Sequence, residues 1–261
     1  MKKYAGVIFF DLDGTLLNLN SIISESNLAL LEQLTEKNYL AVIASGRSPI
    51  EIEEITKGTA INSYVSLNGQ YVVIEGKVFA SHVIETALIE EVLAFAEELG
   101  HPVSCYTPYE YRINFIDEAT KKLYELDNAP LPKMDSKFYQ SNDINMLYLF
   151  SDEMKHDELL IEKFNEKLTF YRDSPYSMAI VNKNRSKKAG IIELLEKLEL
   201  KDLTNTYAFG DGNNNISIFD VVTHSVAMGN ANDTVKAAAT FITHDYESDG
   251  IEFALKKLNV L

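Results

Sequence analysis

The chain of 261 residues carries 24 Lys and Arg against 39 Asp and Glu, which gives a formal net charge of −15. Such a charge excludes binding to nucleic acid or to an anionic membrane through the overall field. The hydrophobic fraction of 46% and the charged fraction of 24% are typical of a globular protein.

Neither disulfides nor membrane spans are expected. Cys105 is the single cysteine, and no Cys and His cluster has the spacing of a zinc site. No segment reaches the ~18 apolar residues of a membrane span. We therefore expect a cytoplasmic protein without nucleic-acid or membrane partners, either monomeric or weakly homo-oligomeric.

Short apolar runs alternate with helix-period segments in the first part of the chain, which is the pattern of βα units around a buried parallel sheet. Ser24 is predicted to cap a helix whose apolar stripe is Leu28, Leu31 and Leu34, and Pro49 to begin the next helix. Asn68-Gly69 predicts a turn. The predicted strands of this part are residues 7–10, 40–44, 64–67 and 70–74.

The pattern changes between residues 83 and 185, where alternating strands at 111–115 and 178–181 are mixed with helices near 88–99, 117–126 and 152–166. From Ser186 the βα pattern returns, with a helix that carries Ile191, Leu194, Leu195 and Leu198 and strands at 207–209, 226–228 and 241–243. We predict an α/β fold: a doubly wound, Rossmann-like parallel-sheet core from residues 1–82 and 186–261, interrupted by an α+β domain at 83–185.

Ligands of open parallel sheets bind outside the carboxyl ends of the strands, so the residues that follow each strand are the candidates for a site. These segments are residues 11–15 (DLDGT), 45–47 (SGR) and 210–212 (GDG), together with a helix that opens with Ser186-Lys187-Lys188. They combine carboxylates, a hydroxyl, a cation and flexible backbone.

Asp11 and Asp13 lie two residues apart, so in an extended backbone both point to one side, where like charges push their proton affinities apart. One of them is then suited to attack a phosphoryl group while the other protonates the departing oxygen. Asp211 completes an oxygen site suited to Mg²⁺. Each segment alone also has a plain structural explanation, as a turn, a helix cap or a solvated first turn.

In this order the segments resemble the motifs of the haloacid dehalogenase superfamily of phosphotransferases, and within it the Cof-type phosphatases. Residues 10–16 (FDLDGTL) are similar to the first motif, 44–47 (ASGR) to the second, 186–187 (SK) to the third and 210–214 (GDGNN) to the fourth. The resemblance extends to residues 67–69, 226–231 and 249–251 and so spans nearly the whole chain.

The resemblance implies that Asp11 is the nucleophile, Asp13 the general acid and then base, Ser45 a phosphoryl ligand and Lys187 the charge-balancing cation. It implies Mg²⁺ held by Asp11, the backbone carbonyl of Asp13 and Asp211. Gly46, Arg47 and Asn214 are the expected substrate-binding residues. The domain at 83–185 falls where the family places its C2-type cap, which excludes water and selects substrates.

Two positions depart from the family pattern. The fourth motif usually ends Asn-Asp, whereas Asn214 is followed here by Asn215, which replaces a carboxylate near the metal with a neutral amide. The third motif usually has Gly after its lysine, whereas Lys188 stands here, so the catalytic lysine is either Lys187, which we favour, or Lys188.

The leading hypothesis is an Mg²⁺-dependent phosphatase, a phosphoric monoester hydrolase that acts on a small phosphorylated metabolite such as a sugar phosphate through an aspartyl-phosphate intermediate. One alternative is phosphomutase-type transfer of the phosphoryl group to another sugar. A second alternative, supported by Asn215, is a catalytically weakened protein with a phosphate-binding or regulatory role.

Overall fold

The computed structural model describes residues 4–126, 129–199 and 203–261. These residues form two compact units: a core unit that runs to Ala80 and resumes as Ser186–Leu261, and an insert unit, Ser81–Arg185. The sequence expectation placed the first junction between residues 82 and 83 and the second between residues 185 and 186. The core unit is thus assembled from two separate stretches of chain.

The core unit is organised around an eight-stranded sheet with the order β13-β12-β11-β1-β2-β3-β4-β5. The pairs from β13 to β3 are parallel, and β3 pairs with β4 in the antiparallel sense. The predicted α/β class with its parallel sheet is therefore confirmed. The strands are β1 (Gly6–Phe10), β2 (Tyr39–Ala44), β3 (Tyr64–Ser66), β4 (Tyr71–Ile74), β5 (Lys77–Ser81), β11 (Thr206–Gly210), β12 (His224–Ala227) and β13 (Phe241–Ile242).

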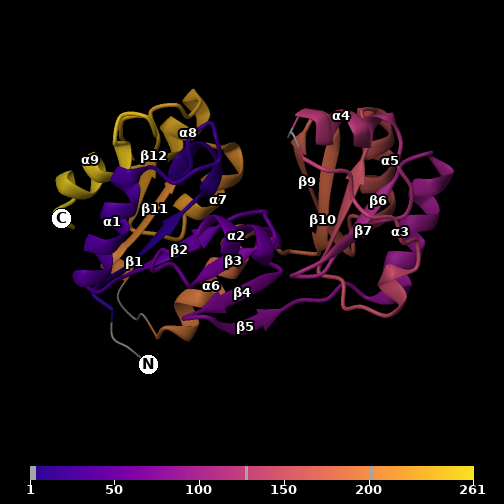
Figure 1. Ribbon diagram of the computed structural model, residues 1–261. Coiled ribbons are helices and arrows are strands. Elements are labelled where there is room, and N and C mark those ends of the chain that lie inside the picture. Colours follow the sequence, from indigo (N-terminus) through magenta and orange to yellow (C-terminus); the bar gives the residue numbers. More distant parts are fainter. Residues whose placement is uncertain (1–3, 127–128, 200–202) are drawn as a thin grey trace. The chain divides into compact units, whose positions relative to one another are not determined.

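Helices pack against this sheet because side chains alternate across each strand. Val7 and Phe9 of β1 pack in one cluster with Ile191 and Leu194 of α6, while α1 packs beside α9 on the other side of the strands (Figure 1). Within the described ranges, no helix is long and apolar enough to span a membrane. The helices of this unit are α1 (Glu25–Glu36), α2 (Pro49–Ile55), α6 (Lys187–Lys197), α7 (Ile216–Phe219), α8 (Asp233–Ala238) and α9 (Gly250–Lys257).

The first helix, α1, begins as predicted but buries a different stripe. The Oγ of Ser24 accepts a hydrogen bond from the N–H of Asn27 at 3.2 Å, which satisfies a free donor of the first turn. Leu30, Leu31 and Leu34 are buried, whereas Leu28 is 39% exposed. The prediction was wrong at Leu28 because this side chain lines a surface cavity rather than the sheet.

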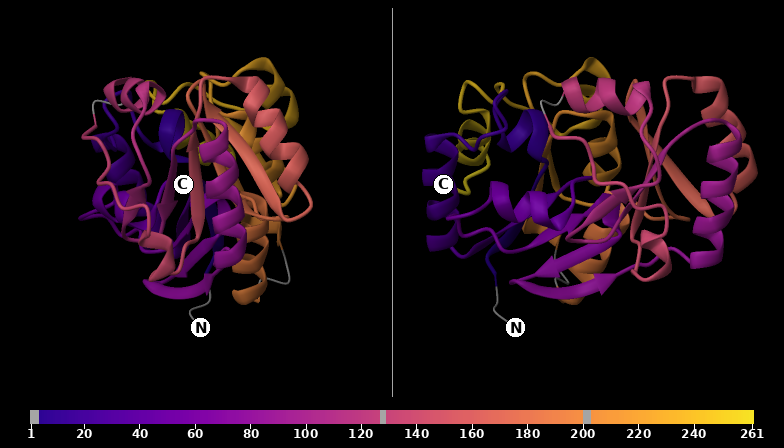
Figure 2. Two further views of the ribbon diagram at one scale, coloured as in Figure 1. Left: turned by 90° about the vertical axis from the view of Figure 1, so that its right-hand side faces the viewer. Right: turned by 45° about the vertical axis from the view of Figure 1, so that its right-hand side comes forward.

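The insert unit has an antiparallel five-stranded sheet with the order β7-β6-β8-β10-β9. Helices α3 (Thr86–Glu98) and α5 (Met154–Phe164) lie side by side against it (Figure 2). Helix α4 (Glu118–Leu126) adds Leu123 to a separate cluster with Ile113 and Phe150. The predicted α+β insert is confirmed. Its strands are β6 (Val103–Tyr106), β7 (Tyr111–Ile113), β8 (Met146–Phe150), β9 (Leu168–Ser174) and β10 (Ser177–Asn182).

Strand β7 ends two residues before the predicted end at residue 115. The side chain of Asn114 accepts hydrogen bonds from the N–H groups of Val103 at 2.8 Å and Phe115 at 3.0 Å. An amide side chain that bonds to the backbone in this way competes with the strand ladder. The alternation of apolar residues therefore continues past the point at which the strand stops.

A pair of histidines is partly buried in the insert unit. The Nε2 of His101 lies 2.7 Å from the Nδ1 of His156, and the Oγ of Ser151 lies 3.4 Å from the same Nε2. Burial, followed by the charge of a protonated His156, lowers the pKa of His101. Asp117, Glu153 and Asp152 act in the opposite direction.

This pair predicts a loss of stability in mild acid. A histidine whose pKa is lower in the folded than in the unfolded state contributes stability that is complete above its unfolded pKa of about 6.5. That stability is lost as the pH falls towards the lowered pKa. In urea unfolding of the full chain at pH about 7.5 and about 5.5, the wild type should lose more stability than His101→Gln. Equal losses would contradict the prediction.

Candidate active site

Three of the candidate site residues lie at the carboxyl ends of neighbouring parallel strands. Asp11 follows β1, Ser45 follows β2 and Asp211 follows β11. Phe10 pairs with Ile43 of β2 and with Phe209 of β11, so the three strands end at one edge of the sheet. This edge is where ligands bind in open parallel sheets.

Asp11 is a buried carboxylate, 8% exposed, that accepts hydrogen bonds on both oxygens. Its Oδ1 accepts from the N–H of Leu12 at 3.0 Å and from the Nζ of Lys187 at 2.9 Å. Its Oδ2 accepts from the Nδ2 of Asn215 at 2.7 Å. Because each carboxylate oxygen has two lone pairs, Oδ2 keeps accepting capacity beyond the bond to Asn215.

The structure brings Lys187, and not Lys188, to the carboxylate of Asp11. The Lys187 side chain is 3% exposed, in contrast to that of Lys188, which is 36% exposed and pairs with Asp220 at 3.1 Å. The Oγ of Ser186 caps helix α6 by accepting from the N–H of Ala189 at 3.0 Å. Lys187 therefore lies in the first turn of the helix, where the helix dipole disfavours a positive charge. The negative charge of Asp11 offsets this unfavourable interaction.

Asp211 is the second carboxylate at this edge. Burial, followed by the negative charge of Asp11, raises the pKa of Asp211 to about 6. Like-charge crowding of carboxylates, which the spacing predicted for Asp11 and Asp13, contributes here to the raised pKa of Asp211.

Two residues that sequence reasoning left without a role also contact Asp211. The Oγ1 of Thr15 donates to its Oδ1 at 3.2 Å, and the Nδ2 of Asn230 lies 3.4 Å from its Oδ2. Asn230 also donates to the carbonyl of Gly14 at 2.9 Å, which ties the loop after β12 to the loop after β1. The only signal for these residues in the sequence was that both lie within segments that resemble the family.

Asp13 has a different environment from Asp11. Its carboxylate forms a two-pronged pair with Arg47, with Nε to Oδ2 at 3.0 Å and Nη2 to Oδ1 at 2.7 Å. The Asp13 side chain is 61% exposed. The spacing of two residues therefore placed both acids in one loop, but their side chains have different partners.

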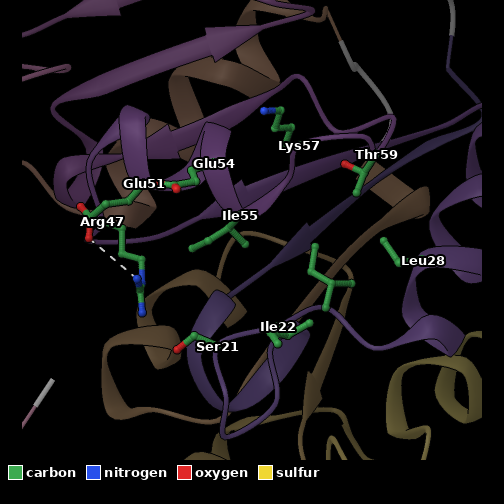
Figure 3. Close-up of a pocket in the computed structure, with 10 residues that line it drawn as sticks. Ser21, Ile22, Leu28, Arg47, Glu51, Glu54, Ile55, Lys57 and Thr59 are labelled. Carbon is green, nitrogen blue, oxygen red and sulfur yellow. Dashed lines mark ion pairs between the residues drawn. The ribbon is translucent and has the colours of Figure 1, made fainter. Parts of the chain in front are cut away.

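Arg47 lines a cavity of about 440 Å³ in the core unit. Apolar side chains of Ile22, Leu28 and Ile55 line it as well (Figure 3). The guanidinium of Arg47 also lies 3.7 Å from the carboxylate of Glu51, which is the ion pair drawn in Figure 3. Arg47 is therefore held between Asp13 and helix α2.

Ser45 and Gly46 form the turn after β2. Ser45 is 3% exposed, and its Oγ accepts from the N–H of Arg47 at 3.1 Å. A Cβ on Gly46 would lie 3.2 Å from the Oδ1 of Asn68, so a larger residue there would crowd that side chain. The hydroxyl hydrogen of Ser45 stays available to a ligand, because the serine accepts in this bond.

Asn214 and Asn215, in the loop after β11, have different environments. Asn214, the expected substrate-binding residue, is exposed, and its carbonyl accepts from the Oγ of Ser217 at 3.4 Å. The structure turns Asn215, rather than Asn214, onto Asp11.

The turn at Leu67, Asn68 and Gly69 supports helix α6. Gly69 has a φ of +86°, and a Cβ there would overlap the carbonyl oxygen of Ser186. The Asn68-Gly69 turn predicted from the sequence is confirmed.

Replacing Gly69 with Ala is expected to destabilise the protein by about 2–4 kcal/mol, because left-handed strain adds to a clash with backbone. Gly76 is a matched control, since its φ is +72° and no atom lies within 4 Å of its Cβ position. Gly76→Ala should cost only about 1–2 kcal/mol. Urea midpoints measure both, and equal costs would contradict the role of the clash.

A divalent cation fits the donors at this edge. Among the described residues, no group of three or more His, Cys, Asp or Glu side chains could hold a metal ion. The metal ligands implied by the resemblance include only two such side chains, the carboxylates of Asp11 and Asp211. The third ligand is the backbone carbonyl of Asp13. Burial, followed by the negative charge of Asp11, raises the pKa of Asp211, so a second buried negative charge at this edge is disfavoured. A hard cation with oxygen ligands, such as Mg²⁺, would offset that charge.

The match to a family model and the similarity to a known sequence indicate the same family. A family model described as haloacid dehalogenase-like hydrolase matches residues 8–255. The Bacillus subtilis protein named "Putative phosphatase YkrA" is 33% identical, with 98% of each chain covered.

Solved structures share the fold. A hypothetical protein from Geobacillus kaustophilus has a TM-score of 0.91 and 31% identity, with 98% of this chain and 99% of that chain covered. The subclass IIB sugar phosphatase BT4131 has a TM-score of 0.84 and 26% identity, with 98% and 100% covered.

Proposed function

The chain belongs to the haloacid dehalogenase-like hydrolase family and is a phosphatase of that family, and from this premise we propose that it is an Mg²⁺-dependent enzyme acting on small phosphorylated metabolites. The substrate class we propose is sugar phosphates, which is supported by the similarity to the sugar phosphatase BT4131. The observation that carries the proposal is the buried pair of Asp11 and Lys187 beside Asp211.

In the proposed mechanism Asp11 is the nucleophile. Its carboxylate attacks phosphorus, and the bond between phosphorus and the leaving oxygen breaks, which gives an aspartyl phosphate. Lys187 and the hydroxyl of Ser45 stabilise the charge on the phosphoryl oxygens. Mg²⁺, held by Asp11, Asp211 and the carbonyl of Asp13, would supply charge neutralisation of the phosphoryl group.

Asp13 is the proposed proton donor and acceptor. It gives a proton to the leaving oxygen in the first step, then takes a proton from the water that attacks phosphorus and releases phosphate and free Asp11. In the structure the carboxylate of Asp13 is paired with the guanidinium of Arg47.

The remaining parts of the proposal concern substrate selection. We assign Gly46, Arg47 and Asn214 to substrate binding, and the insert unit to a C2-type cap, which in this family selects substrates. The resemblance of residues 44–47 and 210–214 to the family motifs supports the first assignment. The position of the insert in the sequence supports the second.

The test is phosphate release from p-nitrophenyl phosphate and from a panel of sugar phosphates, with Mg²⁺ and with EDTA. We expect turnover that depends on Mg²⁺ and that differs among the sugar phosphates. An isomeric sugar phosphate in place of free phosphate would identify a phosphomutase. A folded protein that binds Mg²⁺ but turns over no substrate would contradict the proposal and support a phosphate-binding role.

A further inference from the structure

Asn215 is a fully buried polar side chain whose amide oxygen bonds to the loop and whose amide nitrogen bonds to Asp11. It is 0% exposed. Its Oδ1 accepts from the N–H of Asp211 at 3.2 Å and from the N–H of Gly212 at 2.9 Å. Its Nδ2 donates to the Oδ2 of Asp11 at 2.7 Å. The side chain therefore connects the loop after β11 directly to the carboxylate after β1.

The surroundings determine which end of the amide faces Asp11. Backbone N–H groups only donate, so the atom that faces Asp211 and Gly212 is the oxygen, and the NH₂ group is left for the carboxylate. A Cβ on Gly210 would lie 2.6 Å from the Cβ of Asn215, so the backbone of β11 approaches this side chain closely. The amide is thus held in one orientation.

The two oxygens of Asp11 are consequently held by different partners. The Oδ1 is bound by Lys187 and by the N–H of Leu12, and the Oδ2 is bound by Asn215. Rotation of the carboxylate would break at least one of these bonds. A nucleophile held in a single orientation avoids the loss of rate that misplacement causes.

We propose that Asn215 is a positioning residue that holds the nucleophilic carboxylate of Asp11 through its amide NH₂ group. This inference rests on the proposed role of Asp11. The departure from the family pattern at Asn215 had suggested weakened catalysis, whereas in this inference the amide itself orients the nucleophile. Restoring the usual family residue should therefore lower turnover.

Asn215→Asp separates the two functions of the side chain. An aspartate has the same shape, and one of its oxygens still accepts from the N–H groups of Asp211 and Gly212. The other oxygen cannot donate, and it places a negative charge beside the Oδ2 of Asp11. Asn215→Ser provides a second, uncharged variant, whose shorter side chain cannot span from the loop to Asp11.

Asn213→Asp is the matched control. It adds the same charge two residues away in the same loop, on an exposed side chain. The Oδ1 of Asn213 accepts from the Nδ2 of Asn232 at 3.1 Å, a role that a carboxylate retains. We expect this variant to keep wild-type kcat and KM for p-nitrophenyl phosphate within about twofold, because it leaves the contacts of Asp11 intact.

The assay compares kcat, KM and the Mg²⁺-induced rise in Tm, at a temperature where circular dichroism shows every variant folded. Asn215→Asp and Asn215→Ser should lower kcat by about 10 to 100-fold, as loss of a group that orients a ligand does. KM should change little, and the Mg²⁺-induced rise in Tm should persist in both variants.

The outcomes distinguish this inference from the proposed function. Unchanged or higher kcat in both Asn215 variants, with Asp11→Asn inactive, would overturn the positioning role alone. A loss of kcat in Asn213→Asp as large as in Asn215→Asp would also overturn it, because charge rather than contact would then be responsible. Full activity of Asp11→Asn would overturn the proposed function itself.

Discussion

Asp11→Asn is expected to lower kcat by about 10,000-fold or more, which is the scale of losing a nucleophile. The amide is neutral and cannot form the acyl phosphate that a carboxylate forms. The substituted side chain has nearly the same volume, and its oxygen can still accept from the Nζ of Lys187, which bonds to the Oδ1 of Asp11 in the wild type. Because Asp11→Asn neutralises one partner of the buried ion pair, it should cost about 3–5 kcal/mol of unfolding free energy. Phosphate release, measured at a temperature where circular dichroism shows the variant folded, should reveal the loss of turnover.

A control for this variant is available on the surface of the same unit. Asp220 also pairs with a lysine of helix α6, Lys188, but the side chain of Asp220 is 65% exposed. Asp220→Asn removes an equal charge from an equivalent type of ion pair, and it should leave kcat unchanged. Retention of more than a few per cent of wild-type kcat by Asp11→Asn would exclude Asp11 as the nucleophile.

Lys187→Met is expected to lower kcat by about 100 to 1,000-fold, comparable to the loss of one donor to a transition-state oxyanion. Methionine keeps the length and the apolar stem of the side chain but removes its charge. The ion pair with Asp11 is buried, so breaking it should also cost about 3–5 kcal/mol of unfolding free energy. Kinetics with p-nitrophenyl phosphate and urea unfolding measure the two effects.

The neighbouring lysine separates these effects from a general loss of charge. Lys188→Met removes the same charge one residue along helix α6, from a side chain that is 36% exposed. An exposed pair contributes about 0.2–1 kcal/mol, so this variant should keep both stability and kcat. Equal losses of kcat in the two variants would contradict the proposed role of Lys187 in stabilising the charge on the phosphoryl oxygens.

Most of the fold was predictable because it depends on local periodicity. Buried parallel strands appear as continuous apolar runs, and β1 and β2 lie where those runs predicted them. The errors fall where side chains compete with the periodicity. Leu28 fits the helical stripe but lines a cavity, and Asn114 ends β7 by bonding to backbone N–H groups.

The sequence by itself determined which residues follow the strands, and therefore that Asp11, Ser45 and Asp211 meet at one edge of the sheet. That inference needs only the places of the parallel strands along the chain and the rule that parallel strands share their carboxyl ends. Only the tertiary structure decided the partner of each side chain. In the folded protein Lys187, and not Lys188, bonds to Asp11. Asp13 pairs with Arg47, and the amide nitrogen of Asn215 donates to Asp11. The reason is that motif spacing fixes the place of a residue along the chain, whereas the direction of its side chain depends on helices and loops that are distant in sequence.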